Sequence, residues 1–107
     1  MGASAEFIAY VQELLVPLGK LDAGRFFGGY AIKYGNRQFA MIMSNTLYLR
    51  VNDATRGQYE AQGSEPFSYA TKKGVVLVRK FYAAPEHLFD DQDQLLAWAR
   101  QAIVAAG

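Results

Sequence analysis

One stretch of the chain, residues 25–51, restricts the fold more than any other, because strand-like runs follow one another there with only short turns between them. The runs and the turns are residues 25–33, Gly35-Asn36, residues 37–43, Ser44-Asn45 and residues 47–51. Turns this short force neighbouring strands to pair antiparallel. The sequence therefore predicts a three-stranded meander. Alternation along its last run places Tyr48 and Arg50 on the face opposite to Leu47, Leu49 and Val51.

Helical patterns and a second hairpin flank the meander. Apolar residues recur with helical spacing from Phe7 to Leu18, Ser4 can cap this helix, and Pro17 should end it near Val16. The later elements are a short helix at Ala54–Gln62 ending at Gly63, a hairpin of Pro66–Thr71 and Val75–Tyr82, a helical turn at Pro85–Phe89 and a helix capped by Asp91.

The predicted order of elements is α-β-β-β-α-β-β-α. An α+β fold follows, in which helices cover one face of a five-stranded antiparallel sheet. A chain of 107 residues suits a single domain, residues 1–107, with its own core. No apolar run reaches the roughly 20 residues needed to span a bilayer, and no leader pattern precedes the first helix, so we expect a soluble, cytoplasmic domain.

Composition restricts the chemistry. The chain has no cysteine, which excludes disulfides, thiolate metal ligands and cysteine nucleophiles, and its single histidine, His87, excludes sites that need two imidazoles. Asp90, Asp91 and Asp93 form the main acidic cluster, but they lack the further oxygen ligands of a cation loop and are interpreted as helix-capping residues. We expect no metal and no cofactor.

A hydrolytic site is a minor alternative. His87 could act as a base toward a serine, but the sequence gives no geometry that links it to one. The candidate serines are Ser4, Ser44, Ser64 and Ser68. A small hydrolase or ligand-binding protein would need a deep polar pocket around His87 or the carboxylates. We therefore expect the protein not to be an enzyme.

The stretch from Arg25 to Tyr34 has two interpretations. Its arginine and aromatic residues are types that anchor protein interfaces, whereas Gly28 and Gly29 could simply bend the strand, form a bulge or allow another backbone to approach. The glycines fit neither a dinucleotide fingerprint nor a phosphate loop. A weak similarity to the aromatic RNA-binding strand of an RRM is offset by the wrong order of elements.

Four basic residues lie on the second hairpin, namely Lys72, Lys73, Arg79 and Lys80. They could contact phosphates and release counterions. Alternatively, they form a solvated hairpin tip and a charged edge strand that prevents aggregation between sheets. The net charge of +1 favours the second interpretation over a self-sufficient DNA-binding protein.

Several short segments occur together in an order that resembles the N-terminal domain of the bacterial TfoX/Sxy competence regulators. They are Arg25–Ile32, Phe39–Ile42, Leu47–Val51, Gly63–Tyr69, Phe81–Pro85 and Leu95–Ala99. The resemblance covers about Phe7 to Ala105. One departure is Phe26, where the family usually has methionine before the Phe-Gly-Gly run, and an apolar exchange of this kind should preserve the fold.

The resemblance implies a fold similar to that of type III secretion chaperones. Full-length members of the family carry a second, smaller domain and promote transcription of DNA-uptake genes together with the cyclic-AMP receptor protein. The chain ends at Gly107, where the first domain of the family ends, so we expect a stand-alone N-terminal domain. The family supplies no catalytic residues.

These observations predict that the chain is a non-enzymatic regulatory module that acts by protein contact. We expect it to form a homodimer. Its partner would be the transcription machinery or a homologue of the cyclic-AMP receptor protein. The residues expected to contact the partner are Arg25, Phe27, Tyr30 and Tyr48, with Gly28 and Gly29 shaping the strand. The alternative is a regulator that contacts DNA phosphates through Lys72, Lys73, Arg79 and Lys80.

Overall fold

The structure, a computed structural model, describes residues 4–107 and has the predicted α+β architecture. Three α-helices and two short 3₁₀ helices accompany six strands in this part of the chain. The elements are α1 (Ala5–Leu15), η1 (Val16–Leu18), β1 (Asp22–Phe26), β2 (Gly29–Tyr34), β3 (Arg37–Met43), β4 (Thr46–Arg50), α2 (Arg56–Ala61), β5 (Pro66–Thr71), β6 (Gly74–Ala83), η2 (Glu86–Asp90) and α3 (Gln92–Ala105).

The described residues form one antiparallel sheet with the strand order β1-β2-β3-β4-β6-β5. The sheet has six strands, so the prediction of five was wrong. The expected first strand, residues 25–33, is divided by a tight turn in which Phe27 and Gly28 both have positive φ, 46° and 81°. Such a turn joins two paired strands, and Arg25 accordingly lies opposite Tyr30.

Local capping signals fix the helices where the sequence predicted them. The Ser4 hydroxyl accepts a hydrogen bond from the Phe7 amide at 3.1 Å, and an Asp91 carboxylate oxygen accepts one from the Gln94 amide at 3.2 Å. The short helix α2 is followed by Gly63, whose φ of +77° is the expected left-handed conformation. The assignment of Asp91 as a capping residue is thus confirmed.

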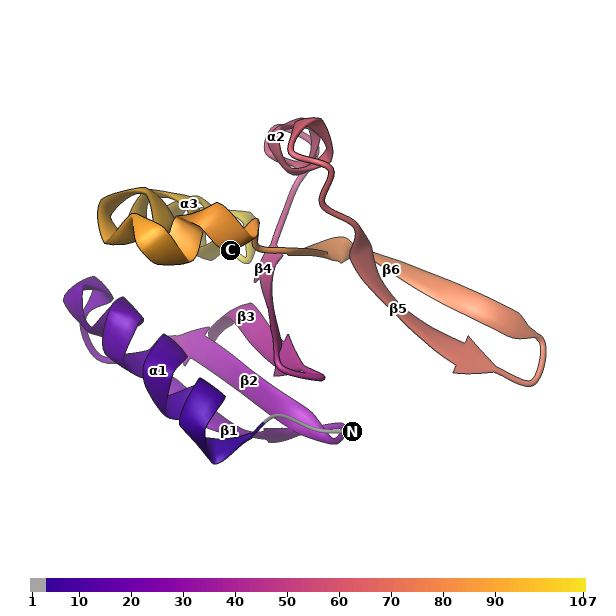
Figure 1. The fold of residues 1–107 in the computed structure, drawn as a ribbon, viewed down its shortest axis with the longest axis horizontal. Helices are drawn as coiled ribbons and strands as arrows, with labels where there is room; N and C mark the ends of the chain where they lie inside the picture. The colour runs from indigo at the N-terminus through magenta and orange to yellow at the C-terminus, as the bar shows by residue number, and fades with distance from the viewer. Residues whose placement is uncertain (1–3) are drawn as a thin grey trace.

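Helices α1 and α3 both pack on one face of the sheet, where Figure 1 shows them beside strands β2 to β4. Alternating residues of the central strands face these helices and build the core, which includes Ile32 on β2, Ile42 on β3 and Leu49 on β4. Val11 and Leu15 from α1 and Leu95 and Ala99 from α3 complete it; all seven side chains are fully buried. The opposite face of the sheet carries neither helix.

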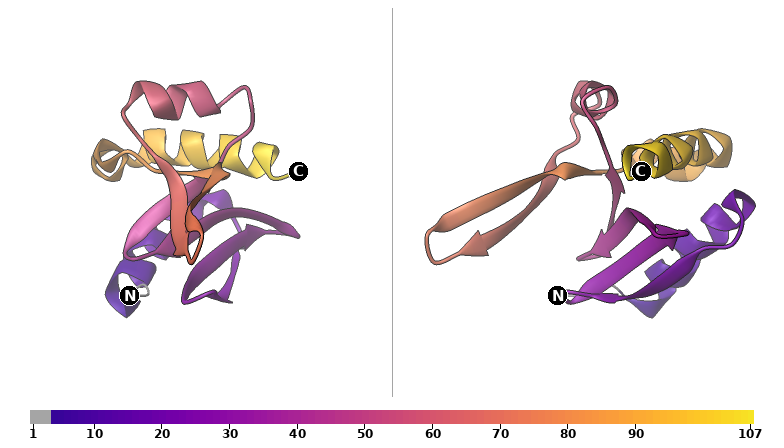
Figure 2. Two further views of the ribbon diagram at one scale, coloured as in Figure 1. Left: turned by 90° about the vertical axis from the view of Figure 1, so that its right-hand side faces the viewer. Right: turned by 180° about the vertical axis from the view of Figure 1, so that it is seen from behind.

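Strands β5 and β6 form an arm that extends away from the helices, as the right-hand view of Figure 2 shows. Only the last three residues of the ten-residue strand β6, Phe81–Ala83, pair with β4. Residues 74–78 pair with β5 alone, which leaves both faces of this hairpin open and Val75, Val76 and Leu77 exposed. A two-stranded hairpin is only marginally stable by itself, so the arm depends on its attachment at β4.

Gly29, at the start of β2, lies directly against the backbone of β3. A Cβ atom at this position would overlap the carbonyl oxygen of Ile42 and the sulfur of Met43, whereas one at Gly24 on β1 would meet nothing within 4 Å. Only a residue without a side chain therefore fits at the start of β2.

We expect Gly29→Ala to lower the free energy of unfolding by about 2 kcal/mol, because overpacking against a strand backbone cannot be relieved by a rotamer change. Gly24→Ala is the matched control and should change it by less than about 0.5 kcal/mol. Urea denaturation of the two variants measures the difference. Equal stabilities would show that β2 and β3 do not approach each other this closely.

Candidate functional site

The sheet face without helices, called here the open face, can be traced from the strand register. Residues directly opposite each other in an antiparallel pair share a face, as do residues two apart on one strand. Lys33 pairs with Gln38, Met41 with Tyr48, and Arg50 with Phe81, and alternation along the strands joins these pairs. The open face therefore includes Lys33, Gln38, Met41, Tyr48, Arg50 and Phe81.

An apolar groove of about 520 Å³ crosses this open face. It lies between the β1–β2 turn and the β5–β6 hairpin, with the methionines of β3 at its floor. Its lining residues are Phe26, Phe27, Met41, Met43, Phe67, Tyr69, Val78 and Phe81. Met41 and Met43 are almost fully covered, so the open face is a concave channel rather than a flat surface.

Aromatic contacts support the two walls of the apolar groove. On one wall, the rings of Phe26 and Phe27 meet edge to face at 4.7 Å between centroids. On the other, Phe67 contacts the ring of Tyr48 edge to face at 5.3 Å and that of Tyr69 at 6.2 Å. The two contacts of Phe67 are of a kind that adds about 0.5–1.5 kcal/mol beyond area burial. The hairpin is thus held against β4 at its base while its tip stays free.

Arg50 borders the apolar groove beside Phe81. Its guanidinium carbon lies 5.7 Å from the centroid of the Phe81 ring, within range of a cation–π interaction. Its Nε is buried and has no hydrogen-bond acceptor within residues 4–107, and the same holds for the side-chain nitrogen of Gln38. Two N–H donors of the open face therefore lack a partner, which is unusual for buried polar groups.

Charge is unevenly distributed over the fold. The strands and the turn between β5 and β6 carry eight of the eleven Lys and Arg residues, but Asp22 is their only acidic residue. The other nine acidic residues lie on the helices and the remaining loops. The net charge of +1 is therefore the sum of a basic sheet and an acidic helical layer.

The four predicted phosphate-contacting residues all lie on the β5–β6 hairpin and are exposed. Lys72 and Lys73 form its tip, and Arg79 and Lys80 lie on β6 between Val78 and Tyr82, where the pairing with β5 is interrupted. An Arg79 terminal nitrogen lies 3.6 Å from a Glu60 carboxylate oxygen, an exposed pair that contributes little to stability. The hairpin itself, residues 66–83, contains no acidic residue.

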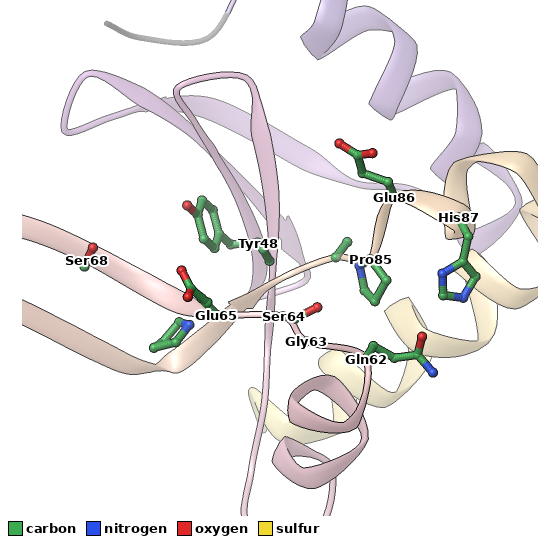
Figure 3. Close-up of a pocket in the computed structure, with 12 residues that line it drawn as sticks. Tyr48, Gln62, Gly63, Ser64, Glu65, Ser68, Pro85, Glu86 and His87 are labelled. Carbon is green, nitrogen blue, oxygen red and sulfur yellow. The ribbon is translucent and has the colours of Figure 1, made fainter.

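A second concavity, here the polar cleft, lies at the base of the hairpin and has a volume of about 530 Å³ (Figure 3). His87, Ser64 and Ser68 line it, together with Glu65 and Glu86. Figure 3 shows the Glu86 carboxylate directed away from His87 and from Ser64. No hydrogen bond joins His87 to either serine among the residues that the structure describes. The cleft lacks the nucleophile–base contact that a hydrolase uses.

Tyr48 separates the polar cleft from the apolar groove. Burial raises the pKa of its hydroxyl, the negative charge of Glu65 raises this pKa further, and a hydrogen bond with Thr46 lowers it. Burial likewise raises the pKa of Tyr59 in the core. The Tyr48 hydroxyl is therefore protonated at neutral pH, which suits hydrogen bonding rather than action as a base.

The structure does not bring the four predicted partner-contact residues onto one surface. Phe27 and Tyr48 lie on or beside the open face, whereas Arg25 and Tyr30 pair with each other on the face that the helices cover. Tyr30 is half-buried and packs against the core. A role in partner contact stays a prediction for all four.

Sequence reasoning did not identify most of the apolar groove. It missed Met41, Met43, Phe67, Val78 and Phe81, and it assigned no role to Arg50. Alternation was a usable signal for two of them, because Met41 and Met43 share a face with Gly29 and Ala31 in the predicted meander. Nothing local indicates that the β5–β6 hairpin lies against that face.

Comparison with known proteins gives one match. The model of the TfoX N-terminal domain family matches residues 13–106, which is most of the chain. No curated protein matches it. Within residues 4–107 there is no group of three residues arranged to hold a metal ion, and no helix there is long and apolar enough to cross a membrane.

Phe27 combines two features that do not favour folding. It has a left-handed backbone conformation, which costs a residue with a side chain about 1–2 kcal/mol, and its side chain is 89% exposed. Asparagine tolerates this conformation well and is typical of such turns. The phenylalanine therefore contributes little to the stability of the isolated domain.

We expect Phe27→Asn to leave the free energy of unfolding unchanged or to raise it by up to about 1 kcal/mol. Phe26→Asn, at the half-buried neighbour with ordinary backbone, should lower it by about 1 kcal/mol through lost apolar burial. Thermal and urea denaturation would compare the two. A loss of stability in Phe27→Asn as large as in Phe26→Asn would mean that the Phe27 ring is needed for folding.

Proposed function

We propose that this chain, which belongs to the TfoX N-terminal domain family, is a non-enzymatic regulatory module of the cytoplasm that acts on competence genes by protein contact. The family match supports the regulatory part of the proposal. The contact surface is the apolar groove, and its occupant is an apolar segment of a protein partner from the transcription machinery, with a homologue of the cyclic-AMP receptor protein as the first candidate.

The observation that carries this proposal is the apolar groove on the only sheet face that lacks helices. A groove of about 520 Å³, lined mainly by aromatic and methionine side chains, has the size and composition of a recognition site. Methionine adapts its shape to different apolar partners, and exposed aromatics such as Phe27 and Tyr69 supply anchors. A contact function also accounts for the energetically unfavourable position of Phe27.

The polar cleft supports an enzymatic function less well. Its serines lack a hydrogen-bonded base, and the raised pKa of Tyr48 disfavours the phenolate that would act as one. The charged residues of the cleft, Glu65, Glu86 and His87, are exposed to solvent, whereas catalytic groups typically act in sites that exclude water. Protein contact is accordingly the better supported function.

Direct DNA binding is the second candidate, and the shape of the hairpin favours it. Figure 1 shows the hairpin projecting from the molecule, and its residues 66–83 carry four basic side chains without an acidic one. Lys72 and Lys73 at the tip could each neutralise one phosphate. The apolar character of the adjoining groove is the reason to rank this candidate second.

Two tyrosines allow a matched test of the proposed function. Tyr69 in the apolar groove is 47% exposed and Tyr10 on α1 is 45% exposed, and each ring contacts a phenylalanine, at 6.2 Å and 6.0 Å. We expect Tyr69→Ser, expressed in a native host that lacks its own copy, to reduce transcription of DNA-uptake genes to the level of the deletion strain, because loss of an aromatic anchor costs about 2 kcal/mol of binding. Tyr10→Ser should keep wild-type transcription. Quantitative measurement of the transcripts provides the comparison.

Two outcomes would contradict the proposal. If deletion of the gene leaves the transcripts unchanged, the regulatory role is wrong. If both serine variants reduce them equally at equal protein level, the effect comes from general destabilisation and the groove is not the contact surface.

For the second candidate, we expect phosphate contact to appear as a steep fall of DNA affinity with salt. The double variant Lys72→Ala/Lys73→Ala should then reduce the slope of log affinity against log salt by about 2, since two phosphate contacts are lost. Fluorescence anisotropy with a labelled duplex measures both quantities. No binding at low salt, or a slope unchanged by the double variant, eliminates direct DNA contact through the hairpin tip.

A further inference from the structure

Arg50 lies on the open face beside the groove residue Phe81, and its guanidinium has no acidic partner within residues 4–107. The two salt bridges found among residues 4–107 use Arg56 and Arg79, and Arg50 instead stacks on Phe81 with its buried Nε unpaired. A guanidinium stays charged even when half-buried, and its planar fork matches a carboxylate. No carboxylate pairs with the Arg50 guanidinium within residues 4–107, so this cation favours a ligand that supplies one.

The surroundings of Arg50 attract negative charge. Asp22, at the far end of β1, is the only acidic residue on the strands, and Glu65 lies in the polar cleft next to Tyr48. The hairpin that forms one wall of the groove contributes four basic residues, of which only Arg79 lies near a carboxylate, that of Glu60. Charges of one sign around a concave surface raise the local concentration of oppositely charged ligands and steer their approach. The occupant of the groove should therefore be acidic.

The side chains that line the groove indicate whether its acidic ligand is a protein segment or a nucleic acid. The floor and walls of the groove are methionine, phenylalanine, tyrosine and valine, and among these side chains only the Tyr69 hydroxyl can donate a hydrogen bond to a phosphate backbone. Apolar side chains gain free energy by burial there, and the volume of about 520 Å³ holds a few side chains rather than the surface of a folded domain. A protein segment meets both requirements, whereas a nucleic-acid duplex, whose bases are stacked inside the helix, meets only the electrostatic one.

We infer that the apolar groove binds a partner segment that combines aromatic or aliphatic side chains with Asp or Glu, one carboxylate of which pairs with Arg50. This inference rests on the proposed function and specifies its ligand. The apolar side chains enter the groove between Met41, Phe67 and Phe81, and the carboxylate supplies the acceptor that the Arg50 guanidinium lacks.

Selection from a library of random peptides displayed on phage, with the full chain immobilised, tests the chemistry of the ligand directly. We expect the enriched sequences to combine aromatic or aliphatic residues with Asp or Glu. The same selection on Arg50→Met, which keeps the apolar stem over Phe81, should still enrich apolar residues but should lose the acidic ones.

Affinities of the enriched peptides, measured by calorimetry, locate the contact. Arg50→Met should weaken binding about tenfold or more, because hydrogen bonds to charged groups are among the strong ones, and Arg50→Lys should restore part of the loss. Arg100→Met, at an exposed arginine of α3, is the matched control and should bind as the wild type does. Thermal denaturation verifies that each variant is folded.

The outcomes separate this inference from the proposed function. Enriched peptides without acidic residues that Tyr69→Ser fails to bind would overturn the inference and leave the groove as the contact surface. Peptides that bind Tyr69→Ser as tightly as the wild type would overturn both, as would a selection without enrichment. If the chain is dimeric in sedimentation and Tyr69→Ser is monomeric, a second copy occupies the groove and the acidic-segment inference is wrong. If a labelled DNA duplex displaces the peptides, and does so less well in the Lys72→Ala/Lys73→Ala variant, the basic surface binds nucleic acid instead.

Discussion

The structure depends on the one-sided covering of its sheet. Two helices of 11 and 14 residues pack against a six-stranded sheet, and they bury one face of β2, β3 and β4. The third helix, α2, contributes Tyr59 to the same core. None of the α-helices of residues 4–107 therefore covers the opposite face, and its apolar residues must be covered by the sheet itself or by a partner. Met41 and Met43 are covered because the sheet curls, and Phe27 is not. The groove is therefore a direct consequence of how few helices the chain has.

The curl of the sheet has a specific cause in β6. Val78 pairs with Phe67, and Tyr82 pairs with the adjacent Pro66. Residues 79–81 of β6 therefore have no paired residue on β5. Such an irregularity bends and twists a strand. It also brings Val78 and Phe81 to the same face, although residues three apart on a regular strand point to opposite faces. The bend turns the hairpin toward β3 and thereby creates the second wall of the groove.

The sequence permitted prediction of what depends on local chemistry. Ser4 and Asp91 cap helices, Gly63 has the left-handed conformation, and the alternation of Tyr48 and Arg50 with apolar neighbours indicated their face, as the structure confirms. The sixth strand was missed because phenylalanine is an unusual residue at a left-handed turn position, so Phe27-Gly28 lacked a recognisable turn signal. The groove was missed because it arises from contact between strands distant in sequence, through a register shift without a local signature.

The net charge of the whole chain does not indicate the charge of any one surface of this protein. A net charge of +1 indicated a protein without strong preference for anionic partners. Assigned to elements, the same residues divide into a basic sheet and an acidic helical layer, and the field that a ligand meets depends on the face it approaches. Acidic residues near helix N-termini, such as Asp91 and Asp93, stabilise those helices, and this placement keeps them away from the strands. The capping that fixes the helices and the basic character of the strands therefore follow from one distribution of charge.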